Sequence, residues 1–412
     1  MTKKIVLFDL RTGGHHIKYV LYLAQYLCEL GYEVTFITLK ADIRTKLLPN
    51  DKPGLTVRLL SNNTNVHVRR NFVARYFQML GALEKCFKFA NEWGADVVSI
   101  MQLDYNELAI MTEVLRRKNP SWRLFGFLVW PHFLYGPDEH ASLLRKAYYS
   151  LTAAVSKHLL KKEALSGMFV HTTAIKQALI ERFSWENSGY KNNLVAVPDP
   201  TESFYGCCSM KEARDRLQLP VGIPILLFFG RLRWDKGPDV LLEAISNIRE
   251  DVVLVIAGQP GYVTQSDIEK HVKKLKGVRI MARIGYIPEE DVKYYFLSAD
   301  AVILPYRRAF KGTSGILQNA ASAGKPVITT DVGEIGRIVR ENSLGIIVEP
   351  ESPYALQQGI QNFLRSRKEV EERVIENAIS YAKQHSWRKM AEIVESSFRK
   401  GIPNGEESGN GD

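Results

Sequence analysis

The sequence predicts an α/β fold built from two parallel-sheet domains of similar size. Short apolar runs alternate with amphipathic segments of helical length, and this alternation restarts near residue 224, after a Pro-Asp-Pro turn at 198–200. The run at 224–229 is nearly all apolar, as expected for a strand that is buried on both faces of its sheet. Because alternating strands and helices favour a parallel sheet covered by helices, two successive sets predict two such domains.

The first half opens with a strand at 4–10, a glycine turn at Gly13 and Gly14, and a helix over about 16–30 that Gly31 is suited to end. This order, followed by a second strand, is the opening of a doubly wound sheet. The other strands are expected at 33–39, 56–60, 96–101, 123–129, 168–172 and 194–197. The other helices are expected at 72–93, 107–118, 141–164 and 174–182.

The second half repeats the same alternation. Its strands are expected at 224–229, 252–257, 278–282, 301–306, 327–330 and 345–348, and its helices at 238–249, 266–275, 289–298, from about 315, and at 335–340. The final helices, at 353–398, extend beyond the second sheet, so we expect one at about 380–400 to cross back to the first domain. The predicted domains are therefore 1–200 with this crossover helix, and 201–379. The polar tail at 401–412 is expected to be disordered.

The composition favours a folded cytoplasmic protein with anionic partners. Apolar residues make up 45% and charged residues 24% of the chain, as in ordinary folded proteins. The four cysteines show no spacing typical of metal ligands or of a disulfide framework, and we expect neither a signal peptide nor a membrane span. A net charge of +10 favours nucleotides or an anionic membrane, whereas no nucleic-acid-binding motif accompanies it.

A glycine-rich stretch stands where the helix after strand 301–306 should begin. Gly312, Thr313, Ser314 and Gly315 would let the backbone approach a ligand, and the first N–H groups of the helix, through Ile316, would point at it. A phosphate is the natural ligand for such a helix start. The alternative is an ordinary loop with a helix cap.

A second cationic site follows the buried strand at 224–229. The segment Gly230-Arg-Leu-Arg-Trp-Asp-Lys-Gly237 places Arg231 and Lys236 at the carboxyl end of that strand. The guanidinium of an arginine fits a phosphate, and a lysine supplies a mobile charge. Together with the helix start they predict a metal-independent diphosphate site, the alternative being solvated surface charge.

These motifs resemble the retaining GT-B glycosyltransferases of family 4, the group 1 transferases. The resemblance rests on G-R-L-x₃-K-G, on the later G-I-x₃-A-A-x-A-G-K-P-V-I, and on the glycine turn after the first strand. It implies two Rossmann-like domains that face each other across a cleft, with a nucleotide-sugar donor held mostly by the second and an acceptor held by the first. It also implies retention of configuration, no required metal and no separate cofactor. Arg231 and Lys236 match the residues that bind the donor diphosphate, and Gly230 lies beside them.

One departure concerns the two glutamates of the family pattern. Counting back from Gly324, their positions hold Lys311 and Asn319. An asparagine amide still hydrogen-bonds a ribose, whereas a lysine only donates and suits an acidic sugar or a phosphate. Three hypotheses follow: the donor sugar is unusual, the transferase activity is lost, or a glutamate elsewhere substitutes.

The first domain contributes histidines at two strand ends. Gly13 and Gly14 match the family turn beside the donor phosphate and the acceptor. We expect His15 or His16 to hydrogen-bond one of these two ligands and assign both residues to acceptor binding, the alternative being an ordinary polar first turn of the helix. His132 follows the strand at 123–129, where the family often has a histidine that contacts the donor sugar. It is our candidate for a catalytic base if one is needed, and the alternative is a structural histidine.

The helix expected at 141–164 combines an apolar stripe with basic flanks. The stripe comprises Leu144, Ala147, Tyr148, Leu151, Val155 and Leu159, and the flanks Arg145, Lys146, Lys157, Lys161 and Lys162. This pattern fits peripheral contact with an anionic membrane, as expected for a lipid-linked acceptor. The alternative is a helix packed on the core.

The leading hypothesis is a glycosyltransferase that moves a sugar from a nucleoside diphosphate, with UDP the favoured carrier, to a hydroxyl of a glycan, a lipid-linked sugar or a small molecule. The rivals are a non-catalytic nucleotide-sugar-binding protein and another two-domain enzyme of this architecture, such as a sugar epimerase or a phosphorylase.

Overall fold

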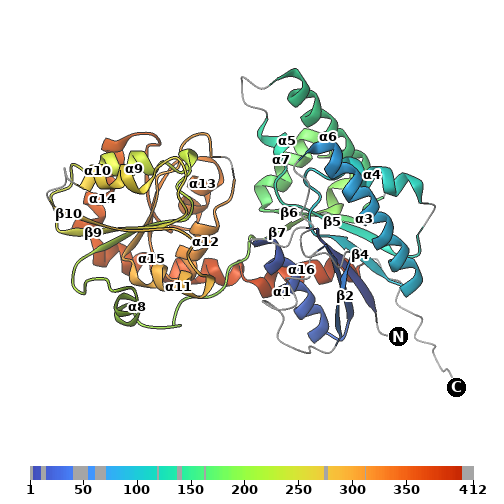
Figure 1. The fold of residues 1–412 in the computed structure, drawn as a ribbon, viewed down its shortest axis with the longest axis horizontal. Coiled ribbons are helices and arrows are strands. Elements are labelled where there is room, and N and C mark those ends of the chain that lie inside the picture. The colour runs from blue at the N-terminus through green and yellow to red at the C-terminus, as the bar shows by residue number, and fades with distance from the viewer. Residues whose placement is uncertain are drawn as a thin grey trace. The chain divides into compact units, whose positions relative to one another are not determined.

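The structure, a computed structural model, describes residues 3–10, 15–39, 54–60, 71–117, 120–136, 142–161, 164–272, 277–310 and 312–400, without the side chains of residues 15, 16, 18 and 135. The tail expected to be disordered lies outside these ranges. The chain divides into two compact units, Met1–Pro198 with Trp387–Asp412, and Asp199–Ser386. Each unit has a parallel sheet between helices, which confirms the α/β fold with two Rossmann-like domains (Figure 1).

The first unit has a seven-stranded sheet in the order β3-β2-β1-β4-β5-β6-β7. Its strands are β1 (Lys4–Phe8), β2 (Glu33–Thr38), β3 (Leu55–Leu59), β4 (Val97–Ile100), β5 (Arg123–Leu128), β6 (Gly167–His171) and β7 (Leu194–Val197). Its helices are α1 (His15–Glu29), α3 (Phe72–Trp93), α4 (Glu107–Arg116), α5 (His132–Tyr135), α6 (Leu143–Lys161), α7 (Thr173–Phe183), the 3-10 turn η1 (Gly189–Asn193) and α16 (Trp387–Arg399).

The second unit has a six-stranded sheet in the order β10-β9-β8-β11-β12-β13. Its strands are β8 (Ile225–Phe229), β9 (Val252–Gly258), β10 (Val278–Ile284), β11 (Ala301–Leu304), β12 (Val327–Thr330) and β13 (Gly345–Val348). Its helices are α8 (Met210–Leu217), η2 (Trp234–Lys236), α9 (Pro238–Ile245), α10 (Gln265–Val272), α11 (Glu289–Ser298), α12 (Gly315–Ser322), α13 (Gly333–Glu341), α14 (Pro353–Arg365) and α15 (Arg367–Gln384).

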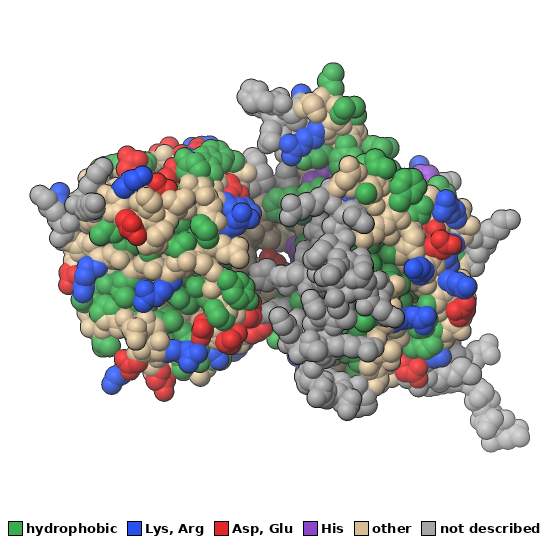
Figure 2. All heavy atoms as spheres, in the orientation of Figure 1, with side chains coloured by type: hydrophobic (Ala, Val, Ile, Leu, Met, Phe, Trp, Pro, Cys, Tyr) green, Lys and Arg blue, Asp and Glu red, His purple; other side chains and the backbone are tan. Residues whose placement is uncertain are grey.

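Alternating side chains of the central strands build the two faces of each core. In β1, Ile5 and Leu7 join the apolar cluster of α1 and α16, whereas Val6 and Phe8 join the cluster of α3, α4, α6 and α7. This is the period-two pattern of a strand buried on both faces. Figure 2 shows charged side chains of both signs scattered among hydrophobic and uncharged ones on the visible described surface.

The C-terminal helix α16 packs on the first unit, against α1. The indole of Trp387 stacks on Tyr22, with ring centroids 4.6 Å apart, and meets Tyr19 edge to face at 5.0 Å. The chain therefore enters the second unit at Asp199 and leaves it after Ser386. Among the described residues, no helix combines the length and the apolar character that a membrane span requires.

Candidate active site

The strand order of the second sheet identifies where a ligand would bind. From β8 the chain runs to β9 and β10 on one side, and then to β11, β12 and β13 on the other. The direction reverses between β8 and β11, which are paired neighbours. In open parallel sheets the crevice at the carboxyl ends of such strands is the ligand site. The loops after β8 and β11 are the two glycine-rich segments that the sequence singles out.

Three of the predicted residues converge beside β8. Gly230 has a φ of +102°, and a Cβ there would lie 3.1 Å from Nζ of Lys236 and 3.5 Å from Cδ1 of Ile316. The lysine ammonium therefore lies against the glycine backbone, close to the first turn of α12. The backbone angle favours a glycine at this point, and a Cβ would crowd the lysine ammonium.

Arg231 and Lys236 differ from the cations around them in having no acidic partner. Within the described part of the chain, no ion pair forms at either side chain, and Arg231 is exposed. By contrast, Arg233 pairs with Asp235, and Arg307 pairs with Asp239 and lies 3.7 Å from Glu351. Two uncompensated cations at the ligand edge of a sheet are a site for an anion.

The start of α12 adds backbone donors to these cations. Ser314 caps the helix by accepting a 3.4 Å hydrogen bond from the N–H of Leu317, and its hydroxyl lies 3.2 Å from that of the buried Tyr306. The ammonium of Lys236 lies 5.6 Å from the centroid of the Tyr306 ring. Tyr306 therefore lies close to both Lys236 and the start of α12. The positive end of the helix dipole at this start favours an anion.

Two residues of the segment that enters the second unit hold the glycine-rich loop and α12. The Thr313 hydroxyl donates to Asp199 at 3.0 Å, and the Thr201 hydroxyl donates to the amide oxygen of Asn319 at 3.3 Å. Asn319 is half-buried, so its amide nitrogen is the group that remains for a ligand hydroxyl. Gly312 is buried and Gly315 is exposed at the helix start, whereas Lys311 lies outside the described residues.

The lysine of the A-G-K-P-V segment has a different environment. Lys325 precedes β12, and burial lowers the pKa of its ammonium to about 8, against the raising effect of Asp300 and Glu371. It lies at the amino end of its strand, away from the ligand edge. Gly324 has a φ of +68° and packs against Tyr205 and Ile375. This part of the segment holds α12 and β12 in place.

In the first unit, the predicted glycine turn and its histidines are only partly described. Gly13 and Gly14 lie outside the described residues. His15 and His16 begin α1 at the carboxyl end of β1, but their side chains are not described. The reversal of strand direction in this sheet lies between β1 and β4, so α1 begins at its ligand edge.

His132 lies at the same edge, inside a cluster of aromatic rings. Its side chain is 3% exposed, and its ring stacks between Tyr105 at 4.7 Å and Tyr148 at 5.7 Å. Nε2 lies 3.1 Å from the hydroxyl of Thr152. Burial lowers the pKa of His132 to about 4, against a raising effect of the Trp130 backbone. The imidazole is therefore neutral at physiological pH and suited to hydrogen bonding rather than to carrying charge.

The depressed pKa predicts how the stability of the protein depends on pH. In the unfolded chain His132 titrates near 6.5, so protonation favours unfolding as the pH falls from about 6.5 toward 4. Between pH 7 and pH 5 the wild type should lose about 2 kcal/mol of unfolding free energy that a His132→Gln variant does not lose. Urea unfolding of both proteins at the two pH values measures this. A stability difference between them that stays constant with pH would contradict it.

Sequence reasoning missed several residues of this first edge. Asp104 follows β4 and accepts hydrogen bonds from the N–H groups of Val129 and Trp130 at 2.9 and 2.7 Å, which fixes the loop that leads to His132. Glu107 is 1% exposed, and burial raises the pKa of its carboxyl well above its usual value. The available signal is their position after an apolar strand, as for His132.

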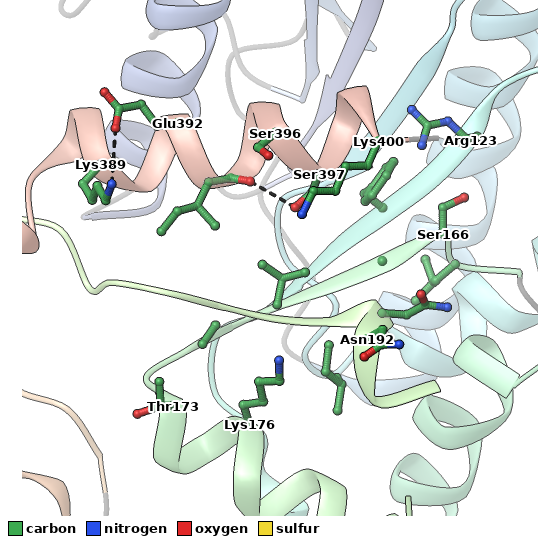
Figure 3. Close-up of a pocket in the computed structure, with 18 residues that line it drawn as sticks. Arg123, Ser166, Thr173, Lys176, Asn192, Lys389, Glu392, Ser396, Ser397 and Lys400 are labelled. Carbon is green, nitrogen blue, oxygen red and sulfur yellow. Dashed lines mark hydrogen bonds and ion pairs between the residues drawn. The ribbon is translucent and has the colours of Figure 1, made fainter. Parts of the chain in front are cut away.

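A separate cavity of about 1070 Å³ lies on the first unit between α16, α7 and the strands β5 to β7 (Figure 3). Lys389 and Glu392 of α16, 3.7 Å apart, line one wall, and Thr173 and Lys176 of α7 line the other. None of the predicted site residues lines this cavity. Among the described residues, no group of three or more His, Cys, Asp or Glu side chains is placed to hold a metal ion.

Comparisons with known proteins identify the sequence pattern and the fold. Residues 209–381 match the family model described as glycosyl transferases group 1. A D-inositol 3-phosphate glycosyltransferase of Corynebacterium glutamicum is 28% identical over 47% of this chain and 47% of its own length. One of Xylanimonas cellulosilytica is 32% identical over 34% of each chain. The chain thus spans about half, or less, of the length of these curated relatives.

Solved structures match both units together. Sucrose-phosphate synthase from Thermosynechococcus elongatus has a TM-score of 0.70 at 19% identity and covers 96% of this chain and 98% of its own. Anabaena HepE in complex with UDP has a TM-score of 0.66 at 14% identity and covers 96% and 99%. Residues 209–381 therefore have the sequence pattern of group 1 glycosyl transferases, and the chain as a whole has the α/β GT-B fold with two Rossmann-like domains.

Proposed function

We propose that this protein is a glycosyltransferase that moves a sugar from a nucleoside-diphosphate sugar to an acceptor hydroxyl, with retention of configuration. The observation that carries the proposal is a pair of cations, Arg231 and Lys236, that form no ion pair with any described residue. They lie beside the start of α12 at the switch point of the second sheet. The family match of this unit supports it.

The chemistry of the proposed site lies in stabilising the leaving diphosphate. As the bond from the sugar to the phosphate oxygen breaks, negative charge grows on that oxygen. Lys236, Arg231 and the first N–H groups of α12 are positioned to bind this charge, and preorganised donors of this kind accelerate a reaction strongly. The acceptor hydroxyl attacks the anomeric carbon and passes its proton to the departing phosphate oxygen on the same face. The scheme assigns the neutralisation of charge to the protein's own cations and requires no side-chain base.

UDP is the nucleotide we propose for the donor. HepE, which shares the fold, has been solved with UDP and with UDP-glucose. Asn319 would offer its amide nitrogen to the ribose, while its oxygen is engaged by Thr201. Lys311 at the usual glutamate position would favour a sugar with an acidic group.

The acceptor is proposed to bind at the carboxyl edge of the first sheet. Gly13 and Gly14 follow β1 in the sequence, and His15 and His16 begin α1. His132 offers a neutral imidazole to the sugar or the acceptor. The acceptor classes are a glycan, a lipid-linked sugar or a small molecule. The curated relatives are named D-inositol 3-phosphate glycosyltransferases, which supports a small molecule among these classes. We place the protein in the cytoplasm, at the face of the membrane.

Nucleotide binding is the first test of the proposal. UDP at 100 times its dissociation constant should stabilise the protein by about 2.7 kcal/mol, equivalent to about 5–10 °C in Tm. Thermal unfolding with UDP, GDP, ADP and their sugar conjugates, each in EDTA, measures this. The shift should disappear in Arg231→Ala. A folded sample that responds to none of these nucleotides would overturn the donor assignment.

The replacement of both family glutamates keeps a second function open, that of a non-catalytic nucleotide-sugar-binding protein. A sugar epimerase is another enzyme that this architecture permits. Turnover separates these functions. A transferase releases UDP and extends an acceptor, an epimerase converts the donor without an acceptor, and a binding protein leaves the donor unchanged at saturation.

A further inference from the structure

We propose that the first turns of α3 and α6 form one surface that inserts into an anionic membrane. Its apolar part, here called the α3–α6 patch, consists of Phe72, Val73 and Phe77 from α3 and Leu143, Leu144 and Leu151 from α6. Tyr148 joins the two halves, because its ring meets that of Phe72 edge to face at 5.3 Å. Figure 2 shows hydrophobic side chains beside Lys and Arg at the tip of α6, at the top of the view.

The exposure of these side chains is unusual for a folded protein. Leu143 and Leu144 are 83% and 84% exposed, and Phe77 and Val73 are 63% and 58% exposed. The patch holds six of the sixteen large apolar side chains that are exposed in the described part of the chain, whereas the others are spread over many elements. Grouped apolar exposure of this kind marks an interaction surface, while single exposed residues do not.

The patch residues of α6 are distinct from the part of this helix that packs in the core. The second half of this helix packs inward through Thr152, Val155, Ser156 and Leu159, which are all buried. At the start of the helix, by contrast, no described residue buries the side chains of Leu143 and Leu144. The expected apolar stripe is thus divided, with its C-terminal part in the core and its N-terminal part on the surface.

The charge around the patch selects an anionic lipid surface. The sequence of α6 contains Arg145, Lys146, Lys157 and Lys161 and no acidic residue, and α3 has none before Glu84. Arg145 and Lys146 directly follow the two leucines and are themselves exposed. Apolar side chains flanked by basic ones let leucine and phenylalanine enter the acyl boundary while the cations stay at the headgroups. A purely apolar protein partner would not require this excess of cations.

The patch is also adjacent to the candidate acceptor edge. Tyr148, which contacts Phe72, stacks on His132 with ring centroids 5.7 Å apart. A membrane held by the patch would therefore lie next to the carboxyl edge of the first sheet. This placement rests on the proposed transferase function and makes a hydroxyl borne by a lipid the acceptor class.

Sedimentation with lipid vesicles tests the surface directly. The full chain should sediment with vesicles of equal parts phosphatidylglycerol and phosphatidylcholine, and much less with phosphatidylcholine alone. Leu143→Ser combined with Leu144→Ser should weaken binding at least about tenfold, because two exposed leucines leave the lipid. Arg145→Gln combined with Lys146→Gln should weaken it on anionic vesicles and reduce its sensitivity to salt.

Two matched control variants distinguish binding through the α3–α6 patch from nonspecific binding to lipid. Leu115→Ser removes a leucine that is 72% exposed at the C-terminal end of α4, outside the patch. Lys85→Gln with Lys88→Gln removes two cations from the middle of α3. Both should bind vesicles as the wild type does. Equal binding by the two-leucine variant overturns the proposal. Failure of the wild type to bind anionic vesicles also overturns it, even where the wild type self-associates through the patch. The Tm shift with UDP, measured on the same variants, reports the donor site independently, so failure of one proposal is distinguishable from failure of the other.

Discussion

Replacing Lys236 with alanine is expected to lower kcat/KM for the proposed transfer by about 10³-fold, the size of effect seen when one preorganised donor to a developing anion is removed. The ammonium lies against Gly230 and beside Ile316, so it reaches the start of α12 where the leaving phosphate would bind. No acidic side chain among the described residues neutralises it, so its charge is directed at the ligand. Steady-state kinetics with a UDP-sugar, once a turned-over donor is known, measures the loss.

The nearby Arg233 provides the matched control. Its guanidinium is paired with Asp235, so Arg233→Ala removes a cation from the same loop that is already neutralised. We expect less than about a tenfold loss for that variant, since a partly exposed ion pair contributes little. A Lys236→Ala protein that retains more than a tenth of the wild-type activity would show that the diphosphate lies elsewhere. Equal losses in the two variants would indicate a general disturbance of the loop.

The fold was predictable because its signals are local. The apolar run of β8, the glycines that follow it and the helix start at Gly315 are each read within a few residues. One local signal was overlooked. Ser209 and Glu212 form a capping box, with both of its hydrogen bonds present, and begin α8, which was not expected.

The arrangement of the site was less predictable because it depends on pairs that are far apart in the chain. Thr313 and Asp199 are 114 residues apart in sequence, and nothing near either residue indicates their hydrogen bond. Tyr306 is the last residue of the strand predicted at 301–306, whereas β11 ends at Leu304. Its contact with Lys236 depends on the pairing of β8 with β11.

The apolar periodicity of α6 also could not show that its first half is exposed and its second half is buried. Leu144 and Leu151 follow the same spacing as Val155 and Leu159, but only the latter pair lies in the core. The difference arises because only the later turns of α6 belong to the buried cluster that also contains residues of α4 and the sheet. Burial of one face is a property of the neighbours of a helix, and these are not written in its own sequence.

Gly237→Ala is expected to lower the free energy of unfolding by about 3 kcal/mol or more. The residue has a φ of +63°, and a Cβ at this position would lie 2.0 Å from the carbonyl oxygen of Pro305. Pro305 directly precedes Tyr306. The two backbones would have to separate, which moves Tyr306 away from Lys236, so UDP affinity should fall together with stability. Urea unfolding of the full chain and calorimetric titration with UDP measure the two effects.

Two further variants identify the cause of that loss. Gly315→Ala adds a Cβ with no heavy atom within 4 Å and without a positive φ, so its unfolding should stay within about 1 kcal/mol of the wild type. Gly237→Asn tolerates the left-handed backbone but keeps the Cβ. If the close approach to Pro305 is the cause, Gly237→Asn should be as unstable as Gly237→Ala, whereas recovery of most of the stability by asparagine would assign the loss to the backbone angle alone. Only the first result would show that the contact of Gly237 with Pro305 holds the loops after β8 and β11 close together. This closeness is what lets Lys236 and the start of α12 bind one diphosphate.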